Sequence, residues 1–324
     1  MNILLLIAGI AILIAGAELF VNSSVNIAKK LNIPTVVIAL TIIAIGTSAP
    51  ETVISTTAAI KGHCNLSMSN IIGSNYFNLL FIVGFCALVR PIDIKFKEMG
   101  SEAWLMVGST AALLAAMIVS RLWIGDGAII PRAVGVVMVV TFIVYLSLLI
   151  RHAMQGRISH EHVTHRTTVI VPPEKTKPLW LAIIGVVFGL GVILWGGELT
   201  VDHAEIIATS YGVDPRIIGL TIIGAGTSLP EFTISLIASI KRETGIVMGT
   251  IVGTNIYNLL FILGLSGTID PLLTTNTQMF DLGALTAGNI MVLIFILARK
   301  KITRIEGTAM LALYFGYLGY VFYS

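Results

Sequence analysis

Long apolar segments dominate this chain of 324 residues, and they limit what it can fold into. About ten segments follow one another, each with the roughly 20 apolar residues that an α-helix needs to cross a bilayer. Only helices and closed β-barrels satisfy their backbone hydrogen bonds inside a membrane, and barrel strands are short and alternating. Charged residues make up 11% of the chain, against about 25% in soluble domains. The sequence therefore predicts an all-α membrane protein.

The loop charges predict the orientation of these spans. We expect the spans near residues 3–21, 36–60, 66–89, 103–121, 128–150, 180–201, 216–240, 246–269, 279–298 and 304–323. With the N-terminus outside, 16 of the 20 Lys and Arg residues fall in internal loops, as the positive-inside rule requires. The polar stretch 151–179 then forms a cytoplasmic linker between two units, 1–150 and 180–324.

The two units are copies of one another. When the sequence is shifted by 180 residues, 24 of the 51 positions from 41 to 91 are identical to those from 221 to 271, including polar, Gly and Pro residues. The similarity reaches back to "GAELFV" at 16–21 and "GGELTV" at 196–201. Each copy contains five spans, an odd number, so the second copy enters the membrane from the opposite side. Inverted-topology repeats of this kind are common in secondary transporters.

The first repeated motif reads "GTSAPE" at 46–51 and "GTSLPE" at 226–231. Pro50 has no N–H and its ring crowds the carbonyl of Gly46, so the helix is predicted to kink or break and to free backbone oxygens near 44–47. A carboxylate such as Glu51 in mid-span costs about 2.5–3.5 kcal/mol and usually marks an ion or substrate pathway. The alternative is that Ser48 and Glu51 form only a capping box. The stretch "TRIEG" at 303–307 is interpreted as an ordinary helix start.

The second repeated motif reads "GSNYFN" at 73–78 and "GTNIYN" at 253–258. Its hydroxyl and second amide lie four residues apart and form one polar stripe in each copy, unless they serve only as interhelical glue. The inverted repeat brings both motifs to the midplane, where every candidate ligand atom is oxygen. Such ligands suit hard cations, and Ca²⁺ takes about 6–8 oxygens. Two carboxylates neutralise one Ca²⁺, and Na⁺, of nearly equal radius, can compete for the same oxygens.

The motif pairs resemble those of the cation/calcium antiporter superfamily, specifically its prokaryotic Na⁺/Ca²⁺ exchangers. The resemblance covers nearly the whole chain and implies ten helices, an outside N-terminus, and Na⁺/Ca²⁺ antiport by alternating access, with the first and sixth helices as a sliding gate. It also implies a location in the prokaryotic inner membrane. By this resemblance the ion ligands are Thr47, Ser48, Glu51, Ser74, Asn78, Thr227, Ser228, Glu231, Thr254 and Asn258, with backbone oxygens of Ala44 and Gly224.

Other functions fit these residues less well. A Ca²⁺/H⁺ antiporter would use the same carboxylates to carry protons, but proton-coupled relatives usually place an acid where Asn78 and Asn258 stand. An intramembrane hydrolase lacks a recognisable nucleophile or paired aspartates in the spans. We therefore expect a monomeric transporter that is not an enzyme, has no resident cofactor and binds no nucleic acid. Glu18 and Glu198 are either gate contacts or interfacial carboxylates.

Overall fold

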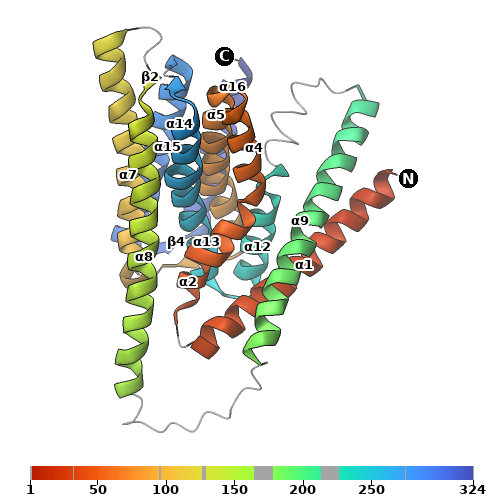
Figure 1. Ribbon diagram of the computed structural model, residues 1–324. Helices are drawn as coiled ribbons and strands as arrows, with labels where there is room; N and C mark the ends of the chain where they lie inside the picture. The colour runs from red at the N-terminus through yellow and green to blue at the C-terminus, as the bar shows by residue number, and fades with distance from the viewer. Residues whose placement is uncertain are drawn as a thin grey trace.

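The computed structural model describes residues 2–31, 33–94, 96–125, 129–163, 178–212, 226–273 and 275–323, and these are almost entirely helical (Figure 1). The elements of the first half are α1 (Asn2–Leu31), α2 (Thr35–Ile38), η1 (Ala39–Ile43), α3 (Ala44–Thr47), α4 (Ala49–Ile60), α5 (Cys64–Tyr76), η2 (Phe77–Ile82), α6 (Val83–Val89), β1 (Ile92–Asp93), α7 (Phe96–Ile124), β2 (Ile129–Ile130) and α8 (Arg132–Val163). Those of the second half are α9 (Leu179–Ser210), α12 (Leu229–Ile240), α13 (Thr244–Ile256), η5 (Tyr257–Leu263), α14 (Gly264–Ile269), β3 (Leu272–Leu273), α15 (Asn276–Ile294), η6 (Phe295–Arg299), β4 (Lys301–Ile302) and α16 (Arg304–Tyr323). The η elements are π-helical.

The prediction of a helical membrane protein is confirmed. Within the described residues, seven helices are long and apolar enough to cross a bilayer, and the bent pair 35–47 and 49–60 makes an eighth span. Only the second part of the predicted span 216–240 is described, as α12. α8 continues to Val163, into the segment predicted as a linker. A helix can extend past the membrane surface because its backbone groups remain satisfied internally.

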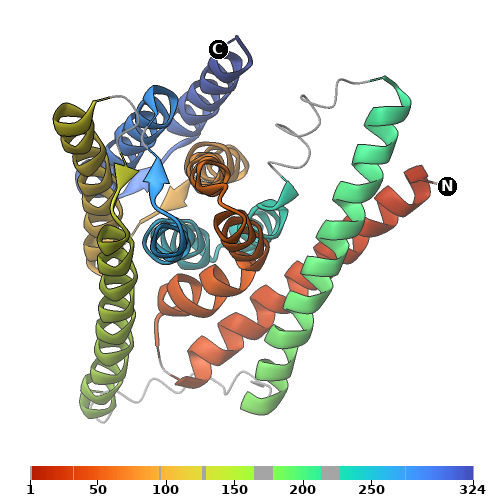
Figure 2. The ribbon, with the colours of Figure 1, turned by 45° about the horizontal axis from the view of Figure 1, so that its top comes forward.

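The bundle has a core and two flanks (Figure 2). The two spans that contain α5 and α13 are the most deeply buried, which makes them the core. α7 and α8 pack against the second half's α15 and α14, and α16 packs against α6. On the other flank α1 and α9 cross each other and run in opposite directions. Each flank therefore combines helices from both halves of the chain.

Two short strand pairs join the halves at opposite ends of the bundle (Figure 1). β1 pairs with β4 through Ile92 and Ile302, and β2 pairs with β3 through Ile130 and Leu272. β1 and β3 lie 180 residues apart and are therefore equivalent in the repeat. Each pairs with a strand of the other half, so the sequence repeat is accompanied by a repeat of the strand pairings.

Glycines allow two pairs of helices to approach closely, and each pair joins a helix of the first half to a helix of the second. A Cβ atom on Gly84 of α6 would lie 2.9 Å from the carbonyl oxygen of Gly307 on α16. A Cβ atom on Gly135 of α8 would lie 2.6 Å from the carbonyl oxygen of Gly264 on α14. Membrane helices associate through such small residues because lipid offers no hydrophobic driving force.

Candidate functional site

The helix that carries the first motif breaks where the sequence predicts. The axes of 35–47 and 49–60 differ by 51°, and Ser48 lies between them with φ −80° and ψ 16°. Pro50 occupies the first turn of α4, where its missing N–H costs no hydrogen bond. The expected release of backbone oxygens is only partial, because the carbonyl of Ala44 still accepts a long 3.3 Å bond from the N–H of Ser48.

Ser48 and Ser228 take the N-cap positions of α4 and α12, but neither side chain caps its helix. The hydroxyl of Ser48 donates to Glu231 Oε1 at 3.4 Å, and that of Ser228 donates to Glu51 Oε1 at 3.2 Å. Each hydroxyl thus reaches the carboxyl group of the other half. The capping-box alternative is therefore wrong for these residues.

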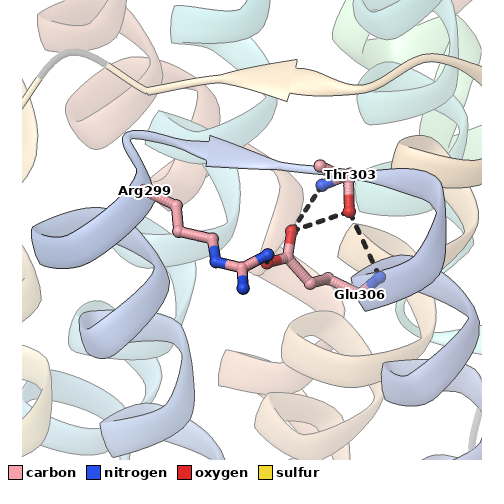
Figure 3. Close-up of polar contacts among 3 residues, drawn as sticks. All are labelled: Arg299, Thr303 and Glu306. Atoms are coloured by element: carbon pink, nitrogen blue, oxygen red, sulfur yellow. Dashed lines mark hydrogen bonds and ion pairs between the residues drawn. The ribbon is translucent and has the colours of Figure 1, made fainter.

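A helix does start at 303–307, as predicted, and a capping box forms there at the start of α16 (Figure 3). The backbone N–H of Thr303 donates to Glu306 Oε2 at 2.7 Å, and the backbone N–H of Glu306 reaches Thr303 Oγ1 at 3.5 Å. Arg299 pairs with the same carboxylate at 3.1 Å. The same sequence pattern therefore has two outcomes, decided by what surrounds it.

Glu51 and Glu231 lie in the first turns of α4 and α12 and are completely buried. The positive ends of the two helix dipoles favour negative charge at these positions. Ser74 donates to Glu51 Oε1 at 2.9 Å and lies 2.8 Å from the hydroxyl of Ser228. The Thr47 hydroxyl donates to the backbone oxygen of Ile43 at 3.0 Å. The carboxyl groups of α4 and α12, the serines at the N-caps of both helices and Ser74 of α5 therefore meet in one network.

Several polar atoms around this network have no hydrogen-bond partner within the described residues. They are Glu51 Oε2, Glu231 Oε2, Thr254 Oγ1, Asn258 Oδ1 and both polar atoms of the Asn78 amide. Their residues are all fully buried. Leaving a buried polar group unsatisfied costs about 1–3 kcal/mol, so the oxygens among these atoms are candidate ligands for a cation.

Asn78 and Asn258 both lie in π-helical turns, η2 and η5, at equivalent positions of the repeat. A π-helical turn inserts an extra residue into a helix and is frequent at functional sites. The residues of the stripes predicted for the second motif are all buried, and the π turns alter the helical spacing within the stripes.

The sequence interpretation missed Asn75 and Asn255, which occupy the axis between the halves. The Nδ2 atom of Asn75 donates to the backbone oxygen of Asn255 at 3.1 Å, and the reciprocal bond from Asn255 measures 3.3 Å. Asn258 Nδ2 donates to Asn75 Oδ1 at 3.0 Å. The other atom of this amide, Asn258 Oδ1, takes no part in that bond. Both asparagines are identical at the 180-residue offset, and that signal could have identified them. They provide the interhelical glue that was considered for the other amides.

The structure thus brings together five of the residues predicted as ligands, namely Ser48, Glu51, Ser74, Ser228 and Glu231. Asn258 bonds instead to Asn75. Gly224 lies outside the described residues. Within the described part of the chain, no three or more His, Cys, Asp or Glu side chains form a metal-binding group. A cation at this site would depend on two carboxylates together with hydroxyl, amide and backbone oxygens. Such a set suits a hard ion.

Comparisons with known proteins agree with this chemistry. The family described as "Sodium/calcium exchanger protein" matches residues 1–151 and 181–323. The chain is 32% identical over 322 residues to the putative antiporter CaxA of Alkalimonas amylolytica, covering 98% of each chain. It is 29% identical over 346 residues to the sodium/calcium exchanger MaX1 of Methanosarcina acetivorans, covering 99% of each. A solved structure of the sodium-calcium exchanger NCX_Mj superposes with a TM-score of 0.80 at 27% identity over 98% of both chains.

Proposed function

Because this chain belongs to the sodium/calcium exchanger family of cation/calcium antiporters, we propose that it exchanges Na⁺ for Ca²⁺ by alternating access. One observation carries the proposal. Glu51 and Glu231, one from each half, are fully buried in a single hydroxyl network, and within the described residues each keeps one oxygen without a hydrogen-bond partner. Mid-membrane carboxylates with unsatisfied oxygens are expected on an ion pathway.

The proposed site holds either one Ca²⁺ or Na⁺ ions in larger number. Two carboxylates balance one Ca²⁺, and the surrounding hydroxyl and amide oxygens replace its hydration shell. Na⁺ carries half the charge, so more than one is needed to compensate Glu51 and Glu231. The proposed ligands are the predicted residues Ala44, Thr47, Ser48, Glu51, Ser74, Asn78, Gly224, Thr227, Ser228, Glu231, Thr254 and Asn258.

The proposed topology has ten spans in two inverted repeats, with the N-terminus outside, in a monomer of the prokaryotic inner membrane. Support comes from the opposite directions of the repeat-related helices α1 and α9. The exchange-related pairings β1·β4 and β2·β3 provide independent support. The excess of Lys and Arg in the predicted internal loops supports this orientation.

We assign the gating movement to α1 and α9, the first and sixth spans. They lie outside the core and pack mainly on each other. A Cβ atom on Gly196 would lie 2.7 Å from the backbone nitrogen of Leu13, and one on Gly189 would lie 3.1 Å from Phe20. Close backbone contact holds the two helices together as a unit, and their smaller contact with the core leaves that unit able to slide over it.

The alternative is exchange of Ca²⁺ for protons, and equilibrium binding separates the two. Purified protein is titrated with radioactive Ca²⁺ at constant pH while Na⁺ or choline is added at the same ionic strength. For a shared site we expect Na⁺ to displace Ca²⁺ and choline to leave it bound. Displacement by lowered pH alone, with no effect of Na⁺, would favour the proton-coupled alternative.

A further inference from the structure

The repeat relates two carboxylates and two lysines outside the central site. Glu18 of α1 corresponds to Glu198 of α9, and Lys61 after α4 corresponds to Lys241 after α12, each pair separated by 180 residues. The central network uses none of the four. The inverted repeat therefore generates two equivalent combinations, Glu18 with Lys241 and Glu198 with Lys61.

Only one of the two combinations is joined in this structure. Lys241 Nζ lies 3.0 Å from Glu18 Oε1 and donates to Asn22 Oδ1 at 2.7 Å. Within the described residues, the side chains of Glu198 and Lys61 have no ion-pair or hydrogen-bond partner. Both are exposed. Two chemically equivalent pairs are thus in different states in the same molecule.

The two pairs lie at opposite ends of the bundle. Ile240, next to Lys241, lines a pocket with Asp93 of β1 and Lys301 of β4. Gly62, next to Lys61, lines a pocket with Leu273 of β3. Since the β1·β4 and β2·β3 pairings mark the two ends (Figure 1), one lysine faces each side of the membrane.

Helix packing follows the same asymmetry. α1 packs along α12, whereas the repeat-related helices α9 and α4 share at most marginal contact. The crossed pair of α1 and α9 is therefore closed onto the core at the Lys241 end and separated from it at the Lys61 end. In an inverted-repeat transporter, the opposite state arises when the two repeats exchange conformations.

We propose that Glu18–Lys241 and Glu198–Lys61 are alternating ion pairs, each of which holds the gate closed on one side of the membrane. This inference rests on the alternating access proposed above. Glu18–Lys241 closes the side that carries β1 and β4 in the present state, and Glu198–Lys61 forms when the gate slides to the other state. Breaking either pair shifts the equilibrium between the states, and the two shifts have opposite directions.

The Glu198–Lys61 pair is expected to be stronger than the Glu18–Lys241 pair. Asn22, which supports Lys241, corresponds in the repeat to Asp202. Lys61 would therefore meet two carboxylates, Glu198 and Asp202, where Lys241 meets one carboxylate and one amide. Asp202→Asn should weaken closure at the Lys61 end, and Asn22→Asp should strengthen closure at the Lys241 end.

Spin-label distances test the proposal without measuring transport. Labels are attached at His63→Cys and Ser210→Cys, exposed positions at the Lys61 end of the core and of α9. Cys64 and Cys86, both buried, are replaced by alanine in this background. Pulsed electron resonance on protein in lipid nanodiscs then gives the populations of long and short distances between the labels.

We expect Glu18→Gln and Lys241→Gln each to raise the short-distance population about two- to fivefold, the range for exposed ion pairs. Glu198→Gln and Lys61→Gln should lower it by a similar factor. Arg304→Gln is the matched control, because Arg304 is exposed at the Lys241 end and has no ion-pair partner within the described residues. It should leave the populations unchanged.

The charge exchange Glu18→Lys with Lys241→Glu should restore the wild-type populations. Shifts in the same direction for both pairs, no shift in either, or a failure of the exchanged pair to restore the populations would overturn the proposal. If one variant of a pair misfolds, the variant of the other partner in that pair takes its place, because both are expected to shift the populations in the same direction. Proton coupling in place of Na⁺ coupling would leave the label shifts intact, so failure of this inference is distinguishable from failure of the proposed function.

Discussion

Replacing either buried carboxylate by its amide is the sharpest perturbation of the proposed site. Glu51 Oε1 accepts the hydroxyls of Ser74 and Ser228, and the oxygen of a glutamine can accept the same two bonds. Glu51 Oε2 has no hydrogen-bond partner within the described residues, so the new amide nitrogen displaces no donor there. Glu51→Gln therefore changes the charge of the site from −2 to −1 and its shape very little.

The loss of one charge is expected to weaken Ca²⁺ binding severely. Removing one partner of a buried ion pair costs about 3–5 kcal/mol, which corresponds to roughly a 100- to 4,000-fold loss of affinity. Glu231→Gln should behave in the same way, because its carboxyl group occupies the equivalent position and is equally buried. Transport of Ca²⁺ at micromolar concentrations should be undetectable in both variants.

The assay compares Ca²⁺ affinity by calorimetry with Ca²⁺ flux in proteoliposomes. Glu102→Gln is the matched control, since Glu102 is also a buried carboxylate but contacts Ser101 on its own helix, α7. It should keep near-normal Ca²⁺ affinity. The reasoning is refuted if Glu51→Gln or Glu231→Gln binds Ca²⁺ within about tenfold of wild type while remaining folded.

Three further predictions follow from single positions. Asn258→Asp adds a third carboxylate, and like charges in one low-dielectric site disfavour full ionisation. As the pH is lowered, Ca²⁺ flux in the variant should then begin to fall at a higher pH than in wild type, and only the variant should respond to K⁺. An unchanged pH profile would show that Asn258 does not face the bound ions. Gly135→Ala places a methyl group 2.6 Å from the Gly264 carbonyl, so the thermal midpoint should drop by several degrees, and an unchanged midpoint would show that α8 and α14 can separate freely. Thr303→Ala removes the cap of α16 and should cost about 0.5–2 kcal/mol with Ca²⁺ affinity unchanged; a loss of affinity would mean that α16 shapes the site.

The break in the first motif could be predicted because its cause is local. Pro50 acts on its own helix, and the clash with the preceding turn requires no knowledge of neighbouring helices. The repeat was equally visible, since polar residues in register survive the low complexity of membrane sequences. Together these two signals were enough to predict the burial of Glu51 and Glu231 in one site.

The partners of the motif residues could not be predicted in the same way. Ser48 reaches Glu231 across 183 positions of sequence, and only the packing of the two halves decides that this bond replaces a capping box. Thr303 and Glu306 have the same spacing and do form the box, and the hydroxyl of Thr303 donates to Glu306 itself at 2.9 Å. The Asn75–Asn255 bonds likewise depend on the axis between the halves.

π-helical turns were also beyond the reach of the sequence patterns. An expected spacing of i and i+4 assumes regular α-helix, yet Asn78 and Asn258 lie within η2 and η5. A π turn shifts the face of the helix on which later residues lie. Its position depends on tertiary packing, which cannot be predicted from sequence periodicity alone.

Ca²⁺ uptake into Na⁺-loaded proteoliposomes tests the central claim most directly. The vesicles are diluted into medium that contains Ca²⁺ with either choline or Na⁺, in the presence of a proton ionophore that abolishes any pH gradient. We predict rapid uptake with choline outside, none with equal Na⁺ on both sides, and none with Glu51→Gln. Uptake that follows an imposed pH gradient and ignores the Na⁺ gradient would contradict Na⁺/Ca²⁺ exchange.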